Sequence, residues 1–164
     1  MLDLTRGILE LDGTTFGPRT TLDQLSFSGL PVQVTRSPAS GTALARGTGL
    51  VHVDGAPFLP EFHFSGGLPS LVLLRPAIQH PPRMTDPAER QQLRYVACAR
   101  WLFVRLGQPH YEHPGEVRYD FPWGSASAVA HLLPRDGCDA GYLSLRYGGG
   151  SKYGQPLLPQ EGLC

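Results

Sequence analysis

Residues 86–107 form the segment that most limits what this chain can fold into. Asp86 can cap the first amides of a helix, Pro87 suits the first helical position, and Glu89 stands where a capping-box partner reaches back. At the other end, Gly107 can adopt the left-handed conformation and Pro109 prevents continuation of the helix. The sequence therefore predicts one long helix over residues 86–106, marked at both ends.

The apolar side chains of this segment spread over more than half of the helix circumference. They are Leu93, Val96, Ala97, Ala99, Leu102, Phe103, Val104 and Leu106. So wide an arc predicts a helix that lies on a sheet and is also covered at its flanks. The remaining stripe carries Arg90, Arg94 and Arg105, with Trp101 between them and Cys98 at its margin. Two interpretations stay open for this stripe: a solvated face with arginine stems over apolar surface, or a partner site, because Trp and Arg dominate interface energetics.

The other expected elements are short. The sequence predicts a first strand at residues 4–11. It also predicts a capping box at the start of a short helix within residues 21–25. Alternation predicts further strands at 32–36, 50–54, 62–64 and 117–121, and a hairpin of 125–133 with 141–147. A continuous apolar run predicts one more strand at 71–74. Because residues 71–74 are apolar on both faces, we expect this strand to be central and to lie beneath the helix. Residues 37–47 are small and polar, which favours a loop.

This order of elements predicts an α+β fold: an antiparallel β-sheet with one long helix packed on it and a short N-terminal helix. The length is that of one domain, which we place at residues 1–147. The glycines at 148–150 and the prolines that follow favour a flexible C-terminal tail over residues 148–164.

Charge and cysteine usage exclude several classes of protein. The 14 basic residues balance the 14 acidic ones, so the net charge is zero, which argues against a nucleic-acid partner. The N-terminus has no basic and apolar leader, and no apolar run approaches the roughly 18 residues that span a bilayer. The three cysteines are odd in number and lack C-x-x-C spacing, which is typical of cytosolic thiols. We therefore expect a cytoplasmic protein that binds neither nucleic acid nor membrane and needs no cofactor.

One loop contains the densest group of metal-ligating side chains, His110, Glu112 and His113. Transition metals bind imidazoles and carboxylates that converge at about 2 Å. The competing interpretation is an exposed polar loop, because the group is bounded by prolines and has no second pair at a recognisable spacing. His52 and His63 each lie between strand apolars and so point away from the core, either as a titrating pair across a hairpin or as solvent-facing residues.

Nucleophile and phosphate motifs are incomplete. Residues 124–128 lack the second glycine of a nucleophile elbow, and residues 148–152 are glycine-rich without P-loop spacing. The mixture of aromatic and arginine side chains instead favours a protein interface. The predicted partner-binding residues are Arg90, Arg94, Trp101, Arg105, Tyr111, Arg118 and Trp123.

Several segments together resemble small cytosolic bacterial proteins of the immunity type. They are Arg100-Trp101-Leu102, Leu106-Gly107-Gln108-Pro109, Tyr119-Asp120-Phe121-Pro122-Trp123-Gly124, Leu143-Ser144-Leu145-Arg146-Tyr147, Gly13-Thr14-Thr15-Phe16-Gly17 and Thr21-Leu22-Asp23-Gln24-Leu25. Members of that class bind and block a toxin delivered by contact-dependent or type VI systems. The resemblance covers about half of the chain, implies a protein partner and carries over no contact residue.

The sequence thus predicts a non-enzymatic protein-binding module, an immunity-type inhibitor of a cognate bacterial toxin, which is a monomer or weak dimer alone. The alternative is a small metal-dependent enzyme or metal-binding protein that uses the loop with His110, Glu112 and His113.

Overall fold

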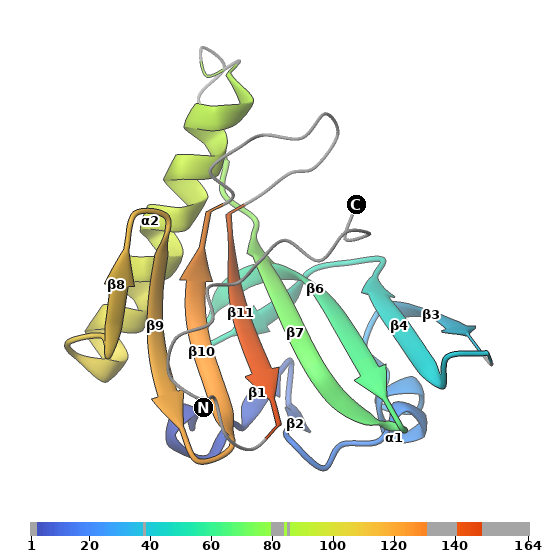
Figure 1. Ribbon diagram of the computed structural model, residues 1–164. Helices are drawn as coiled ribbons and strands as arrows, with labels where there is room; N and C mark the ends of the chain where they lie inside the picture. Colours follow the sequence, from blue (N-terminus) through green and yellow to red (C-terminus); the bar gives the residue numbers. More distant parts are fainter. Residues whose placement is uncertain (1–2, 38, 80–83, 85, 131–140, 149–164) are drawn as a thin grey trace.

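The computed structural model describes residues 3–37, 39–79, 84, 86–130 and 141–148, and all statements about the fold concern these residues. They form an α+β fold in which a nine-stranded antiparallel sheet carries one long helix (Figure 1). The helical elements are η1 (Leu4–Arg6), α1 (Leu22–Ser26) and α2 (Pro87–Leu106). The strands are β1 (Leu9–Leu11), β2 (Thr14–Phe16), β3 (Val32–Ser37), β4 (Thr42–Gly47), β5 (Val51–Val53), β6 (Ala56–Ser65), β7 (Leu68–Pro76), β8 (Tyr111–His113), β9 (Glu116–Phe121), β10 (Gly124–Val129) and β11 (Tyr142–Tyr147).

The main sheet has the order β3-β4-β6-β7-β11-β10-β9-β8, and β5 pairs with the start of β6. Strands β6 and β7 form a long hairpin, as do β9 and β10, and β11 joins the two hairpins in the middle. The predicted central position of residues 71–74 is confirmed, because β7 lies inside the sheet and contacts α2. The small β1–β2 sheet is a separate antiparallel hairpin.

Only one face of the main sheet carries the hydrophobic core. Side chains alternate along a strand, so Val72 and Leu74 of β7 share this face with Leu143 and Leu145 of β11. Helix α2 packs on β7, β10 and β11. The N-terminal elements η1, β1, β2 and α1 cover the rest of the same face (Figure 1). Phe16 of β2, for example, packs against Phe62 with ring centroids 4.8 Å apart.

Helix α2 begins and ends where the sequence predicts. Asp86 Oδ1 accepts a hydrogen bond from the Ala88 amide at 2.9 Å, and Gly107 has a φ of 74°. The Gly107 amide donates to the Phe103 carbonyl at 2.9 Å, while its own carbonyl accepts from the Tyr119 hydroxyl at 2.8 Å. That last bond fixes the end of the helix to β9.

The predicted rotation of this helix is wrong. Gln91, Arg94, Cys98 and Leu102 form its buried stripe, and burial raises the pKa of the Cys98 thiol to about 12. Val96, Phe103 and Val104, expected in the core, are exposed.

A close approach to the sheet accounts for this rotation. Gly141 precedes β11, and a Cβ atom at that position would lie 2.6 Å from the Gln91 carbonyl oxygen and 2.8 Å from the Arg94 Cβ. Near Gln91 and Arg94, α2 therefore lies directly against the backbone at Gly141, and these two side chains face the sheet. The wide apolar arc of the helix allows this rotation without exposing every apolar side chain.

Two further expectations differ from the structure, one open alternative for His52 and His63 is excluded, and one expectation lies outside the described residues. Residues 42–47, predicted as loop, form β4, because they pair with β3 on one side and β6 on the other. Residues 4–11 are a 3-10 turn followed by a three-residue strand. His52 lies opposite Pro57 and binds Asp12, so it does not pair with His63. The predicted tail over 148–164 lies outside the described residues except for Gly148.

Among the described residues, no helix is both long enough and apolar enough to cross a membrane.

The rotation of α2 can be tested with two truncations on the same helix. Leu102 has no exposed surface, so Leu102→Ala should lower the free energy of unfolding by about 2–5 kcal/mol, because it removes buried methyl groups and leaves a cavity. Val104 is 71% exposed, so Val104→Ala should change the free energy of unfolding by no more than about 0.5 kcal/mol. Urea unfolding of both variants measures the difference, and equal losses would contradict the observed rotation.

Candidate functional site

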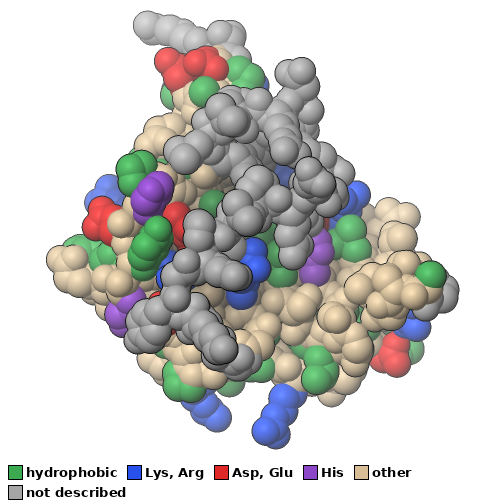
Figure 2. Space-filling view, viewed as in Figure 1, with side chains coloured by type: hydrophobic (Ala, Val, Ile, Leu, Met, Phe, Trp, Pro, Cys, Tyr) green, Lys and Arg blue, Asp and Glu red, His purple; other side chains and the backbone are tan. Residues whose placement is uncertain are grey.

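The candidate site is the second face of the main sheet, which we call the polar face. The described helices and the β1–β2 hairpin all pack on the opposite face. Strand register places on the polar face the side chains Leu44, Arg46, Glu61, His63, Leu71, Leu73, Tyr111, His113, Glu116, Arg118, Asp120, Ser125, Ser127, Ser144 and Arg146. Figure 2 views this face and shows acidic, basic and histidine side chains close together over β8 and β9.

At one end of the polar face, four side chains form what we call the Arg118 cluster: Tyr111, Glu116, Arg118 and Asp120. Arg118 Nε lies 3.2 Å from Asp120 Oδ1, and Nη1 lies 4.0 Å from Glu116 Oε1. The guanidinium carbon lies 4.7 Å from the centroid of the Tyr111 ring. Positions 116, 118 and 120 share a face because they alternate along β9, and Tyr111 is the register partner of Arg118 on β8.

The Arg118 cluster is held away from water. Glu116 and Arg118 are each 8% exposed. Burial raises the pKa of the Glu116 carboxyl, while Arg118 and Arg146 act in the opposite direction. Glu116 Oε1, Arg118 Nε and Asp120 Oδ1 are buried and make no hydrogen bond of good geometry. Unsatisfied buried polar atoms cost free energy, so the surrounding fold holds this cluster together at an energetic cost.

Two of the helix residues predicted as a partner site, Trp101 and Arg105, make contacts within the molecule. Arg105 Nε and Nη2 both donate to Asp54 Oδ2 at 3.1 Å, and its guanidinium carbon lies 3.8 Å from the Trp101 ring centroid. Trp101 in turn meets Phe58 edge to face, with the centroids 6.3 Å apart. Together these contacts fasten the last turns of α2 to the β5–β6 hairpin. Arg94 is 8% exposed, so it is no part of a solvated stripe.

Trp123 also has an internal role. Its Nε1 donates to the Leu4 carbonyl at 2.9 Å, and its ring stacks on Phe121 at 5.3 Å. A Cβ atom on Gly7 would lie 2.6 Å from the Trp123 ring, so only glycine fits there, and Gly7 also has a positive φ of 68°. Trp123 thus fastens the N-terminal elements to the sheet, on the face opposite the Arg118 cluster.

The predicted metal ligands do not converge. His113 lies on the polar face, whereas Glu112 points to the other side of β8 because neighbouring residues alternate. His110 Nδ1 accepts a hydrogen bond from the Asp120 amide at 2.8 Å. Among the described residues, no group of three or more His, Cys, Asp or Glu side chains could hold a metal ion. The geometry gives the metal hypothesis no site at this loop.

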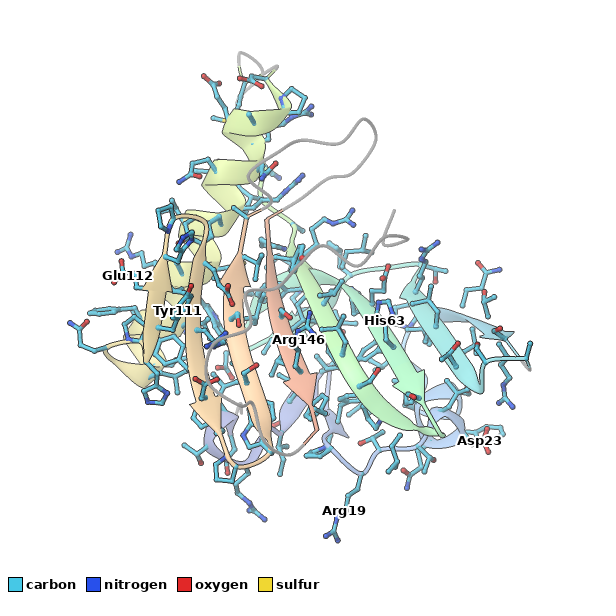
Figure 3. The ribbon with its side chains drawn as sticks, viewed as in Figure 1. Arg19, Asp23, His63, Tyr111, Glu112 and Arg146 are labelled. Carbon is cyan, nitrogen blue, oxygen red and sulfur yellow. The ribbon has the colours of Figure 1, made fainter. Side chains whose placement is uncertain are left out.

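A second polar group of the face was not predicted from the sequence. Glu61 Oε1 lies 2.7 Å from His63 Nε2, and Glu61 Oε2 accepts from Arg46 Nε at 3.2 Å. The hydrogen bond from His63 is the main cause that lowers the pKa of the Glu61 carboxyl, and burial acts in the opposite direction. Arg146 of β11 lies on the same face as His63, with β7 between them (Figure 3).

Part of this arrangement does have a signal in the sequence. Arg118 and Asp120 alternate along the strand predicted at 117–121, and Glu116 directly precedes it at the same spacing, which indicates three charged groups on one face. The proximity of His63 to Arg146 has no such signal, because it depends on the order β6-β7-β11.

Comparison of the chain with family models, with curated proteins and with solved structures found no significant match. The functional argument therefore depends on the residues of this chain alone. They define an α+β protein in which one sheet face holds the core and the other carries a buried cluster of charged and aromatic groups.

The hydrogen bond between His63 and Glu61 should make stability depend on pH. Because the folded-state pKa of Glu61 is below its unfolded value of 4.5, its stabilising contribution is present above pH 4.5 and is lost as the pH falls through the folded-state pKa. Glu61→Gln should therefore cost on the order of 1 kcal/mol at pH 6, and the difference from the wild type should shrink below pH 4.5. Urea unfolding of both proteins at pH 6 and at pH 3 measures this difference in the free energy of unfolding.

Glu112→Gln is the matched control, because Glu112 is exposed and makes no described ion pair. It should leave stability unchanged at both pH values. A cost for Glu61→Gln that is the same at pH 6 and at pH 3 would contradict the assignment.

Proposed function

We propose that this protein is a non-enzymatic binding module that blocks a partner protein by covering it, and that the Arg118 cluster is the centre of its binding surface. The observation that carries the proposal is the arrangement of Arg118 between Glu116 and Asp120 and above the Tyr111 ring. Tyrosine and arginine are the side chains that most often dominate binding energy at protein interfaces.

The fixed conformation of the side chains in the Arg118 cluster supports a binding role. A side chain that is already fixed before association loses little conformational entropy when the partner arrives. Arg118 is fixed by two carboxylates and one aromatic ring. Beside it, His113 is exposed on the edge strand β8 of the same face, in the position of a polar rim.

The charges of the cluster favour a basic partner surface. Two carboxylates, Glu116 and Asp120, lie beside the Arg118 guanidinium, and Arg146 also acts on Glu116 through space. The raised pKa of Glu116 reflects the burial of an acid that a further cation would stabilise. The exposed edge at Tyr111 offers an aromatic ring to an incoming Arg or Lys. A partner with clustered basic side chains is therefore complementary in charge.

The choice of a toxin as the partner rests on the resemblance to immunity-type proteins. The segments that carry it form the end of α2, the β9–β10 hairpin, β11, and β2 with the cap of α1. Of the Arg118 cluster, only Asp120 lies within these segments. Glu116 and Arg118 precede it on β9, and Tyr111 lies on the neighbouring strand β8.

Binding can be tested by capture of a partner from native lysate with the tagged protein, followed by reconstitution from purified components. We expect a one-to-one complex, neutralisation of the partner's toxicity on co-expression, and a dissociation constant that Arg118→Ala and Tyr111→Ala each raise about tenfold or more. Tyr111 lies on the edge strand, so its truncation separates loss of binding from loss of folding.

Arg105→Ala is the control that distinguishes the two surfaces, because Arg105 belongs to the helix stripe and contacts Trp101 and Asp54. It should leave affinity unchanged. A loss with Arg105→Ala alone would move the interface to α2, and the absence of any stoichiometric partner would overturn the proposed function.

A further inference from the structure

A pocket of about 370 Å³ opens on the polar face away from the Arg118 cluster. Its described lining comes from β3, β4, β6, the β6–β7 hairpin and β11, with no residue from β8, β9 or β10. The volume falls at the lower end of the range of small-molecule sites. Two titratable side chains, His63 and Arg146, line it together with the hydroxyls of Thr35, Ser37, Thr42, Ser65 and Ser70.

The strand register sets the spacing of the two titratable groups. His63 of β6 and Arg146 of β11 are both register partners of Leu71 on β7. Adjacent strands are about 4.8 Å apart, so the two backbones are separated by roughly 10 Å, and both side chains point to the same face. Figure 3 shows them on either side of β7. A small molecule that lies over Leu71 therefore meets Arg146 at one end and His63 at the other.

Arg146 is a cation without a bound anion in the described part of the chain. Its Nε is buried and has no hydrogen-bond partner there. Burial is the main cause that lowers the pKa of the guanidinium, and the acidic groups that oppose this effect, Tyr142 and Glu116, act only through space. A planar guanidinium with unused donors binds a carboxylate through two parallel hydrogen bonds.

His63 is oriented for a different contact. Its Nε2 lies 2.7 Å from Glu61 Oε1, and the lowered pKa of Glu61 keeps that carboxyl ionised, so Nε2 carries the proton and donates. The Nδ1 atom makes no described hydrogen bond. In the neutral ring, Nδ1 is then an acceptor, which pairs with a hydroxyl donor.

We propose that this pocket binds a small hydroxycarboxylic acid, with its carboxylate on Arg146, its hydroxyl on His63 Nδ1 and its carbon chain over Leu71. The apolar side chains of Leu44 and Leu71 form the floor on which the carbon chain rests. The strand-end hydroxyls of Ser37, Thr42 and Ser65 supply further donors at the rim. The pocket and the proposed protein interface occupy different strands of the polar face.

The test uses 3-hydroxybutyrate, butyrate and inorganic phosphate as probes of the full-length protein. Amide shifts in NMR spectra locate binding, and calorimetric titration measures affinity. We expect saturable binding of 3-hydroxybutyrate with shifts in β6, β7 and β11, and binding of butyrate that is weaker by about tenfold, because the bond to His63 is missing. Phosphate that binds more tightly than both acids would show a phosphate site and overturn the organic-acid assignment.

Three variants separate the roles of the two side chains. Arg146→Gln should weaken both acids by at least about tenfold, whereas His63→Gln should weaken only 3-hydroxybutyrate, to the affinity of butyrate. Arg75→Gln is the matched control, since Arg75 lies on the same face of β7 but does not line the pocket. Arg146→Lys keeps the positive charge but cannot form two parallel hydrogen bonds to a carboxylate. It therefore replaces Arg146→Gln if that variant does not fold.

Unchanged affinity in Arg146→Gln, equal effects of Arg75→Gln, or no saturable binding of 3-hydroxybutyrate would overturn the assignment. The protein interface is tested separately, by the variants at Tyr111 and Arg118.

Discussion

The alternation of side chains across one long antiparallel sheet is the constraint on which the rest of this structure depends. A strand places every second residue on the same face, and a shift of one residue would exchange the two faces. In β11, Leu143, Leu145 and Tyr147 enter the core while Ser144 and Arg146 face away from it. The same alternation on β9 separates Val117 and Tyr119 from the charged side chains of the Arg118 cluster. Core and candidate sites are therefore two results of one register.

The elements predicted correctly are those with local chemical signals. Asp86, Pro87 and Gly107 mark the ends of α2 within the segment itself, and the capping box of Thr21 and Gln24 forms as expected. The rotation of α2 was not predictable, because its apolar arc is too wide to select one side and the deciding contact is with Gly141, far along the chain. β4 was missed because its small and polar residues show no clear alternation until two neighbours pair with it.

In the candidate sites too, features with a local signal in the sequence were predicted and features set by distant strands were not. Tyr111 and Arg118 were expected at a binding surface, and they meet because a short hairpin joins β8 to β9. Trp101, Arg105 and Trp123 were expected there as well, but each is engaged in contacts that hold the elements together. Residue type alone could not distinguish a partner contact from a contact within the molecule, because arginine and tryptophan are common in both. Arg146 was missed because its environment is made by strands that are distant in the sequence.

The position of β11 has a consequence for how the chain reaches this fold. It is the last described strand in sequence order, yet it occupies the middle of the sheet, between β7 and β10. During synthesis, the edges of β7 and β10 that pair with β11 therefore stay unpaired until residues 142–147 leave the ribosome. Completion of the sheet is a long-range step of high contact order, so a chain that stops before β11 exposes two strand edges, each a template for aggregation.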